Sequence, residues 1–215
     1  MRSVCAVAGA AFFVCSLAGL AESKIPCDQK VNAAFQSRAN LVIESQPAGL
    51  HIVGTDEKTI RVSCTAGDED NAQHVHLHFT STPNGGHLSI EGTHLRQGDN
   101  SLEVKIEIPR RTNLRVHMFA GEVRIEELKG NKDIDLGAGQ ITIASIHDGD
   151  YRSVNASVSV GEVQARAFGA DKGGFFRNFT RRNLQGEYQL YAHVTTGEID
   201  LLGNTEHDGQ QAKPD

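Results

Sequence analysis

The side chains best placed for chemistry are histidines gathered in one short segment. His74, His76 and His78 alternate with other residues, and Glu91 follows after a turn sequence. In a strand this spacing puts the three imidazoles on one face, with neighbours about 6.5–7 Å apart. Imidazole is a good ligand for Zn²⁺, Cu²⁺ and Ni²⁺. The segment is a candidate metal site with ligands His74, His76, His78 and Glu91, although we expect an outward polar face that holds no metal and no cofactor.

A β-hairpin is the element that must position these side chains. Residues 74–79 and 87–91 alternate apolar and polar, and residues 82–86 (Thr-Pro-Asn-Gly-Gly) are typical of a turn. The predicted register pairs apolar with apolar residues, which gives Phe79 opposite Leu88, His78 opposite Ser89, Leu77 opposite Ile90 and His76 opposite Glu91. Two histidines on a flat strand point the same way, so a metal site would need His51, His94 or another group to close it from the side.

The rest of the chain is also typical of β-structure. From residue 39 onward, short alternating runs are separated by turn sequences, and the clearest run, residues 102–108, stops at Pro109. No window has a helical stripe. We expect an all-β domain over residues 39–203, after an N-terminal extension over residues 22–38 and before a disordered C-terminal tail over residues 204–215.

The first residues have the layout of a secretory signal peptide. Arg2 is followed by an uncharged, largely apolar run from Val4 to Leu20, and Gly19 and Ala21 precede Glu22 as small cleavage-site residues. A membrane anchor is the alternative, but the run has the minimum length of a span and no basic flank follows it. We expect residues 1–21 to be removed and the protein to be secreted to the periplasm, cell surface or medium, with no transmembrane segment left.

Two cysteines remain after removal of that segment, Cys27 and Cys64. In an oxidising compartment two cysteines usually pair, so we expect a Cys27–Cys64 disulfide. Two free thiols or an intermolecular bond are the alternatives. Neither cysteine lies in a CxxC motif, which gives no support to a redox role.

A repeat fills the C-terminal half. Four glycines are each followed by Glu or Gln and then by Val or Ile: Gly121, Gly139, Gly161 and Gly197. Their spacings are 18, 22 and 36, which predicts a further degenerate unit near residues 175–183. Each strand–glycine–strand unit is too short to bury its own apolar face, so we expect units of about 18–22 residues stacked in a single-stranded β-solenoid or β-roll. A β-sandwich is the alternative.

Apolar residues fall into columns when the chain is aligned on those glycines. The columns lie five and three residues before each glycine and two and four after it. We expect one stacked interior made by Val116, Met118, Val123, Ile125, Leu136, Ile141, Ile143, Val158, Val163, Val194, Ile199 and Leu201.

Residues 120–125 and 195–201 resemble the repeats of the DUF4097 family of putative adhesins, and the strand over residues 102–109 followed by residues 114–116 resembles that family's lead into its repeats. The resemblance covers residues 39–203. It implies a β-helix repeat domain like those of bacterial cell-surface head domains. The family has no established catalytic residues, so it assigns none here. This chain has Glu or Gln after the glycine where the family has Asp.

The chain is expected to bind rather than to catalyse. It has no nucleophile elbow, metalloprotease helix, phosphate-binding loop or dinucleotide fingerprint. Its formal net charge of −6 argues against binding nucleic acid. We expect an exported, non-enzymatic module of the bacterial cell envelope, a putative adhesin whose ligand is a protein or a surface glycan. An envelope sensor or scaffold is the alternative, and a carbohydrate-active β-helix enzyme is a more remote one.

Overall fold

The computed structural model describes residues 25–27, 29–46, 48–65, 75–82, 84–92 and 102–203, and the side chains of all of these except residues 25, 26 and 171–176. Nearly all of this chain is β-structure in one mixed sheet, as the sequence predicts. The thirteen strands are β1 (Ile25–Pro26), β2 (Val31–Ala34), β3 (Asn40–Ser45), β4 (Ala48–Thr55), β5 (Thr59–Thr65), β6 (Val75–Thr82), β7 (Gly85–Gly92), β8 (Glu103–Pro109), β9 (Asn113–Glu126), β10 (Lys132–Ile146), β11 (Tyr151–Ala165), β12 (Ala170–Arg182) and β13 (Tyr188–Gly203).

Helix is confined to two single 3₁₀ turns, η1 (Asp148–Asp150) and η2 (Arg166–Phe168), in the described chain. Neither these turns nor any other described segment forms a helix of the length and apolarity that a bilayer span requires. Two strands, β1 and β2, lie in the segment for which the sequence shows no periodicity.

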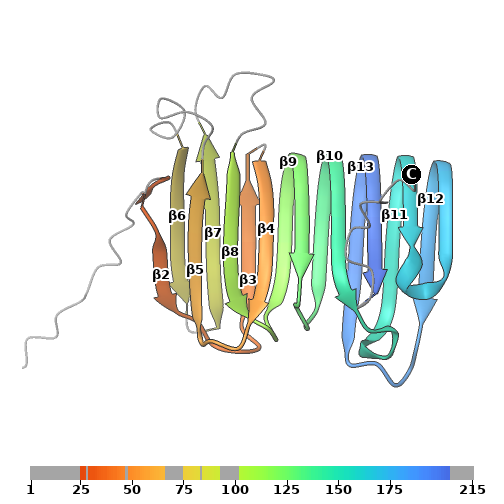
Figure 1. Cartoon of the computed structure of the whole chain (residues 1–215), viewed down its shortest axis with the longest axis horizontal. Coiled ribbons are helices and arrows are strands. Elements are labelled where there is room, and N and C mark those ends of the chain that lie inside the picture. The colour runs from red at the N-terminus through yellow and green to blue at the C-terminus, as the bar shows by residue number, and fades with distance from the viewer. Residues whose placement is uncertain are drawn as a thin grey trace, which may run out of the picture.

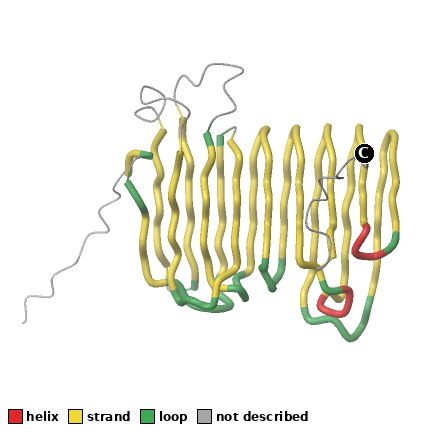
Figure 2. The backbone as a smooth tube through the Cα atoms, in the orientation of Figure 1, coloured by secondary structure: helices red, strands yellow, loops and turns green. Residues whose placement is uncertain are grey.

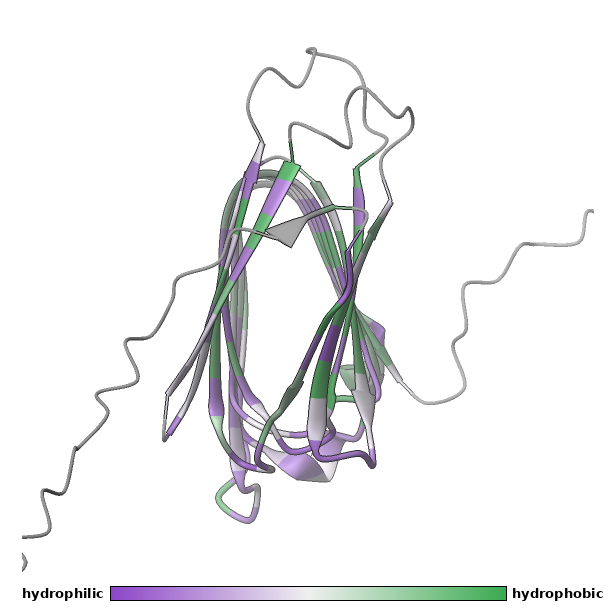
Figure 3. Ribbon diagram, turned by 90° about the vertical axis from the view of Figure 1, so that its left-hand side faces the viewer, coloured by the Kyte–Doolittle hydropathy of each residue, from purple (hydrophilic) through white to green (hydrophobic). Residues whose placement is uncertain are grey.

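The sheet folds over on itself to form two walls around an apolar interior. The five long strands β9 to β13 bend near their middles, and Figure 2 shows the strand trace passing through these bends without a break. The first wall contains β1, β6, β7 and β3 beside the first halves of β9, β10, β13 and β11. The second wall contains β2, β5, β8 and β4 beside their second halves. Figure 3, a view along the stack, shows the two walls facing each other.

The four repeat glycines form one line across four parallel strands. Gly121 of β9 pairs with Gly139 of β10, which pairs with Gly197 of β13, which pairs with Gly161 of β11. Each has φ between 129° and 146°, and an added Cβ would lie 1.7–2.1 Å from a carbonyl oxygen of the neighbouring strand. Glycine is therefore required both by conformation and by space.

The strands do not stack in chain order. β13, the last strand, lies between β10 and β11, and β12 pairs antiparallel with the other edge of β11 (Figure 1). A further strand does fill the gap near residues 175–183, as predicted: it is β12, whose Gly174 pairs with Gly161. It runs antiparallel at the edge of the sheet, however, and does not lie between β11 and β13. The spacing of 36 arises because β12 turns back along the edge of the sheet and the chain then returns to a position two strands further in.

The apolar columns are confirmed as the interior. All twelve residues predicted to be buried are at most 2% exposed. The columns are rows of direct neighbours in the sheet. Ile134 of β10, for example, lies between Val116 of β9 and Ala192 of β13.

Polar contacts join the ends at which β3, β9 and β10 begin. Asn113 donates from Nδ2 to Oδ1 of Asn40 at 3.1 Å and accepts at its own Oδ1 from the backbone N–H of Asn131, also at 3.1 Å. Nearby, the Lys132 ammonium is buried and donates to the carbonyl oxygen of Leu128 at 2.7 Å and to the Tyr151 hydroxyl. Burial lowers the pKa of Lys132 to about 7, although the charge of Asp150 opposes this shift.

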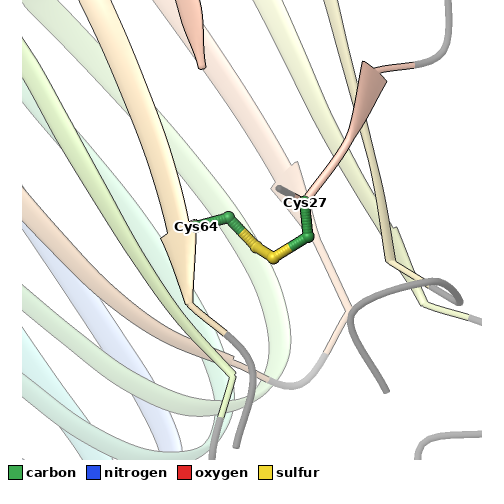
Figure 4. Close-up of a disulfide and its surroundings, with 2 residues drawn as sticks. All are labelled: Cys27 and Cys64. Carbon is green, nitrogen blue, oxygen red and sulfur yellow. A yellow bond between two sulfur atoms is a disulfide. The ribbon is translucent and has the colours of Figure 1, made fainter. Parts of the chain in front are cut away.

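A disulfide joins Cys27 to Cys64, as the sequence predicts (Figure 4). Cys27 directly follows β1, which pairs with β6 of the first wall. Cys64 lies on β5, which pairs with β8 of the second wall. The bond therefore links the two walls at the end of the stack opposite to β12.

Candidate functional site

The β6–β7 hairpin has the predicted register. His76 lies opposite Glu91 and His78 opposite Ser89, while the apolar partners face the interior. His74 and His94 fall outside the described residues. His51 lies on β4 in the second wall, across the core from β6, and cannot close a site on this hairpin. The described residues contain no group of three or more His, Cys, Asp or Glu placed to hold a metal ion.

The histidine-bearing side of the hairpin continues as one face across the whole first wall. Because the alternate residues of these strands are buried, the remaining side chains point outward in cross-strand rows. We call this surface the histidine face. Its first row runs from β6 to β12 through His78, Ser89, Glu44, His117, Asp135, His193, Ser157 and Asn178. Its second row runs through Thr80, His87, Val42, Arg115, Asp133, Tyr191, Asn155 and Thr180.

Contacts within the histidine face run between neighbouring strands. His87 Nε2 lies 3.4 Å from Glu44 Oε2, and His117 Nδ1 lies 3.8 Å from Asp135 Oδ2. Arg115 donates from Nε to Asp133 Oδ2 at 2.8 Å. These are exposed pairs, and an aromatic side chain, Phe119, stands 78% exposed where β9 enters its bend.

A serine–histidine contact on this face has the composition of a nucleophile and its base. Ser157 Oγ lies 3.0 Å from His193 Nδ1, and Asp135 is the register partner of His193 on the other side. A hydrolase would also need hydrogen-bond donors for an oxyanion, which backbone N–H groups commonly supply. β11 is paired on both edges, by β13 and β12, so the amides around Ser157 are used by the sheet. The backbone beside Ser157 therefore offers no free N–H group to an oxyanion.

The outer surface of the second wall, which we call the ion-pair face, carries fixed charges. Lys105 Nζ lies 3.0 Å from Glu107 Oε1, and Arg124 donates from Nε to Glu126 Oε1 at 2.6 Å. The hydrogen bond from Lys105 is the main cause of a lowered pKa at Glu107. Burial tends to raise the pKa of Glu126, but hydrogen bonds from Arg124 and His51 outweigh it and lower that pKa.

Two hollows lie along one cross-strand row of the ion-pair face, beside the glycine line. The larger, about 630 Å³, is lined by Gly139, Gln140, Val160, Gly161, Glu162, Gly197 and Glu198. The smaller, about 230 Å³, is lined by Gly49, Leu50, His51, Leu102, Glu103, Glu122 and Arg124. The row itself reads Glu103, Gly49, Glu122, Gln140, Glu198 and Glu162 across six strands.

The side chains beside the larger hollow form an acidic, hydrogen-bonded rim. Gln164 donates from Nε2 to Glu198 Oε1 at 2.6 Å, and Gln140 donates to Asp200 Oδ2 at 2.8 Å. Burial raises the pKa of Glu198, and the charges of Asp200 and Glu162 add to the effect. Sequence reasoning did not predict this rim, although its signal was visible, because the residues after the four repeat glycines are Glu122, Gln140, Glu162 and Glu198.

No family model matches the chain, and no curated protein matches it either. Among solved structures, the chain is similar to a putative cell adhesion protein from Clostridium sporogenes, with a TM-score of 0.51 and 13% identity over 81% of this chain and 99% of that one. A second structure, a putative lipid binding protein from Parabacteroides distasonis, aligns with a TM-score of 0.22 and 11% identity over 80% of this chain and 72% of that one. The first likeness supports the fold; the DUF4097 resemblance stays a prediction from the sequence.

Proposed function

We propose that this protein is an exported, non-enzymatic binding module that attaches to a ligand on a cell or envelope surface, as an adhesin does. The observation that carries the proposal is the regular array of outward polar, charged and aromatic side chains across the first wall. Neighbouring strands lie about 4.8 Å apart, so the array offers contacts at a fixed repeat. A fixed repeat suits an extended ligand with repeating groups, such as a glycan or an extended protein segment.

The architecture is consistent with such a role. The two walls share one apolar interior, and the two hollows given above lie on the outside of the second wall. We interpret β9, β10, β13 and β11 as a short β-solenoid whose last coil has been inserted between two earlier ones. The disulfide and the fold shared with a putative cell adhesion protein support export and surface binding.

Binding of the purified protein to intact cells and envelope fragments of its source organism tests the proposal. The face variant carries Arg115→Ser, Phe119→Ser and Tyr191→Ser, and a matched control carries Lys105→Ser, Arg124→Ser and Gln140→Ser on the ion-pair face. We expect saturable binding by the wild type and the control, and loss of binding by the face variant.

Treatment of the cells separates the ligand classes. Loss of binding after protease treatment indicates a protein ligand, and loss after periodate oxidation indicates a glycan. Absence of saturable binding to any fraction, or equal binding by both variants, would contradict the proposal.

A further inference from the structure

Histidines are concentrated on one side of the molecule. The described residues include seven histidines, and five of them lie on the histidine face: His76, His78, His87, His117 and His193. The other two, His51 and His147, lie elsewhere. The sequence places only the first three close together; β9 and β13 bring His117 and His193 into the same rows.

Within the described residues, the charged groups that face these imidazoles in the sheet are mostly acidic. His87 faces Glu44 and His76 faces Glu91. His117 lies between Glu44 on β3 and Asp135 on β10. Asp135 also faces His193, whose other neighbour is Ser157.

The remaining neighbours add little charge. His78 faces Ser89 on β7, while β1 runs along the other edge of β6 with Pro26 beside His76. Across the two rows and the His76–Glu91 pair, the charged partners are therefore Arg115 and the four carboxylates of Glu44, Glu91, Asp133 and Asp135.

Protonation of the histidines reverses the net charge of this face. With neutral imidazoles the sum is one Arg and four carboxylates, 1 − 4 = −3. With five protonated imidazoles it becomes 5 + 1 − 4 = +2. Histidine is the side chain whose ordinary change of charge lies between pH 8 and pH 5, so a face rich in imidazoles carries the groups that such a reversal needs. Among the described residues, the ion-pair face is built on Lys, Arg and Glu and carries one histidine, His51, against five on the histidine face.

We propose that the histidine face is an acid-activated docking surface for an anionic polysaccharide. The positive charge gained in acid complements sulfate or carboxylate groups, and the flat rows place it along an extended line. The exposed rings of Tyr191, in the second row, and of Phe119, next to the first row, can stack on the apolar faces of sugar rings. The inference rests on the proposed binding role of this face and adds the ligand class and its control by pH.

Dextran sulfate is the probe, with uncharged dextran as the reference, and affinity is measured at pH 5.5 and 7.5 in low and moderate salt. We expect the wild type to bind dextran sulfate roughly tenfold or more tightly at pH 5.5, with the gain reduced by salt. The variant carrying His78→Asn, His87→Asn, His117→Asn and His193→Asn should lose that gain. A control with His51→Asn and His147→Asn should keep it.

Circular dichroism and thermal melts at both pH values check that each variant is folded. An equal gain at pH 5.5 in the four-histidine variant, or no binding by folded wild type, overturns the inference. Binding to vesicles of phosphatidylglycerol but not to dextran sulfate also overturns it, because the surface would then recognise a membrane. If dextran sulfate binding fails while face-dependent binding to cells at pH 7.5 persists, the proposed function stands and this inference alone is lost.

Discussion

The two outer faces differ although the walls beneath them are nearly alike. Both walls contain halves of the same bent strands, and both bury apolar residues with the same period. Yet one exterior carries five histidines and exposed aromatic rings, while the other carries lysine, arginine and glutamate in ion pairs. Packing of the interior requires apolar residues at the inward positions but does not determine the outward residues. The outward residues can therefore differ between the walls and provide a binding function on one of them.

The largest expected effect comes from breaking the bend that joins the two walls. Gly139→Ala forces a side chain into a position with φ of 129° and places a Cβ 1.8 Å from the Gly121 carbonyl oxygen. We expect a loss of about 3–5 kcal/mol in the free energy of unfolding, or failure to fold.

Urea denaturation followed by circular dichroism measures that loss. Gly149→Ala is the matched control, because nothing lies within 4 Å of an added Cβ there. A Gly139→Ala protein as stable as this control would refute the account of the glycine line.

Removal of the disulfide unlinks the two walls at the end of the stack that lies away from β12. The double variant Cys27→Ala with Cys64→Ala frees a link between residues 37 positions apart. We expect a loss of about 2–4 kcal/mol. Denaturation with and without reductant checks this: reductant should destabilise the wild type to the level of the variant and leave the variant unchanged. No reductant effect on the wild type would count against the bond.

We expect the free energy of unfolding to depend on pH because of the buried Lys132 at the start of β10. Burial lowers the pKa of Lys132 in the folded protein to about 7, below the value of 10.5 for a free lysine. Between these two pH values the unfolded chain therefore binds the proton more tightly than the folded protein does. Stability should therefore rise with pH above about 7, by up to about 1.4 kcal/mol per pH unit. Burial also raises the pKa of Tyr151, which opposes the rise once tyrosine ionises in the unfolded chain near pH 10.

The slope of unfolding free energy between pH 7 and 9.5 tests this, with Lys132→Met as the reference. The wild type should gain stability relative to the variant across that window. Parallel curves for the two proteins would show that Lys132 keeps its charge in the fold.

The smallest effect is expected from the ion-pair face. Arg124→Gln removes the ion pair with Glu126. The Arg124 side chain is 29% exposed and the Glu126 side chain is 22% exposed. Partly exposed pairs contribute little, so we expect a loss below about 1 kcal/mol and no change in ligand binding. A loss of binding in this variant would move the binding surface to the second wall.

Much of the fold could be predicted because strand alternation fixes which side each residue faces. The core columns, the glycine line and the β6–β7 register all follow from local sequence. Strand order could not be predicted, because each repeat presents the same columns to its neighbours. Ala192 of β13 fits beside both Ile134 and Ala156. Without the strand order, the rows that bring His117 and His193 together could not be predicted. The acidic rim could have been predicted, because its residues directly follow the repeat glycines in the sequence.

The most direct test of the central claim is hydroxyl-radical footprinting of the protein bound to the envelope fragments that it captures. Protection read by mass spectrometry compares His117, Phe119 and Tyr191 on the first wall with His51 and Lys105 on the second. The account predicts that bound ligand protects the first group and leaves the second as reactive as in the free protein. Protection of the second group alone, or equal protection of both, would contradict it.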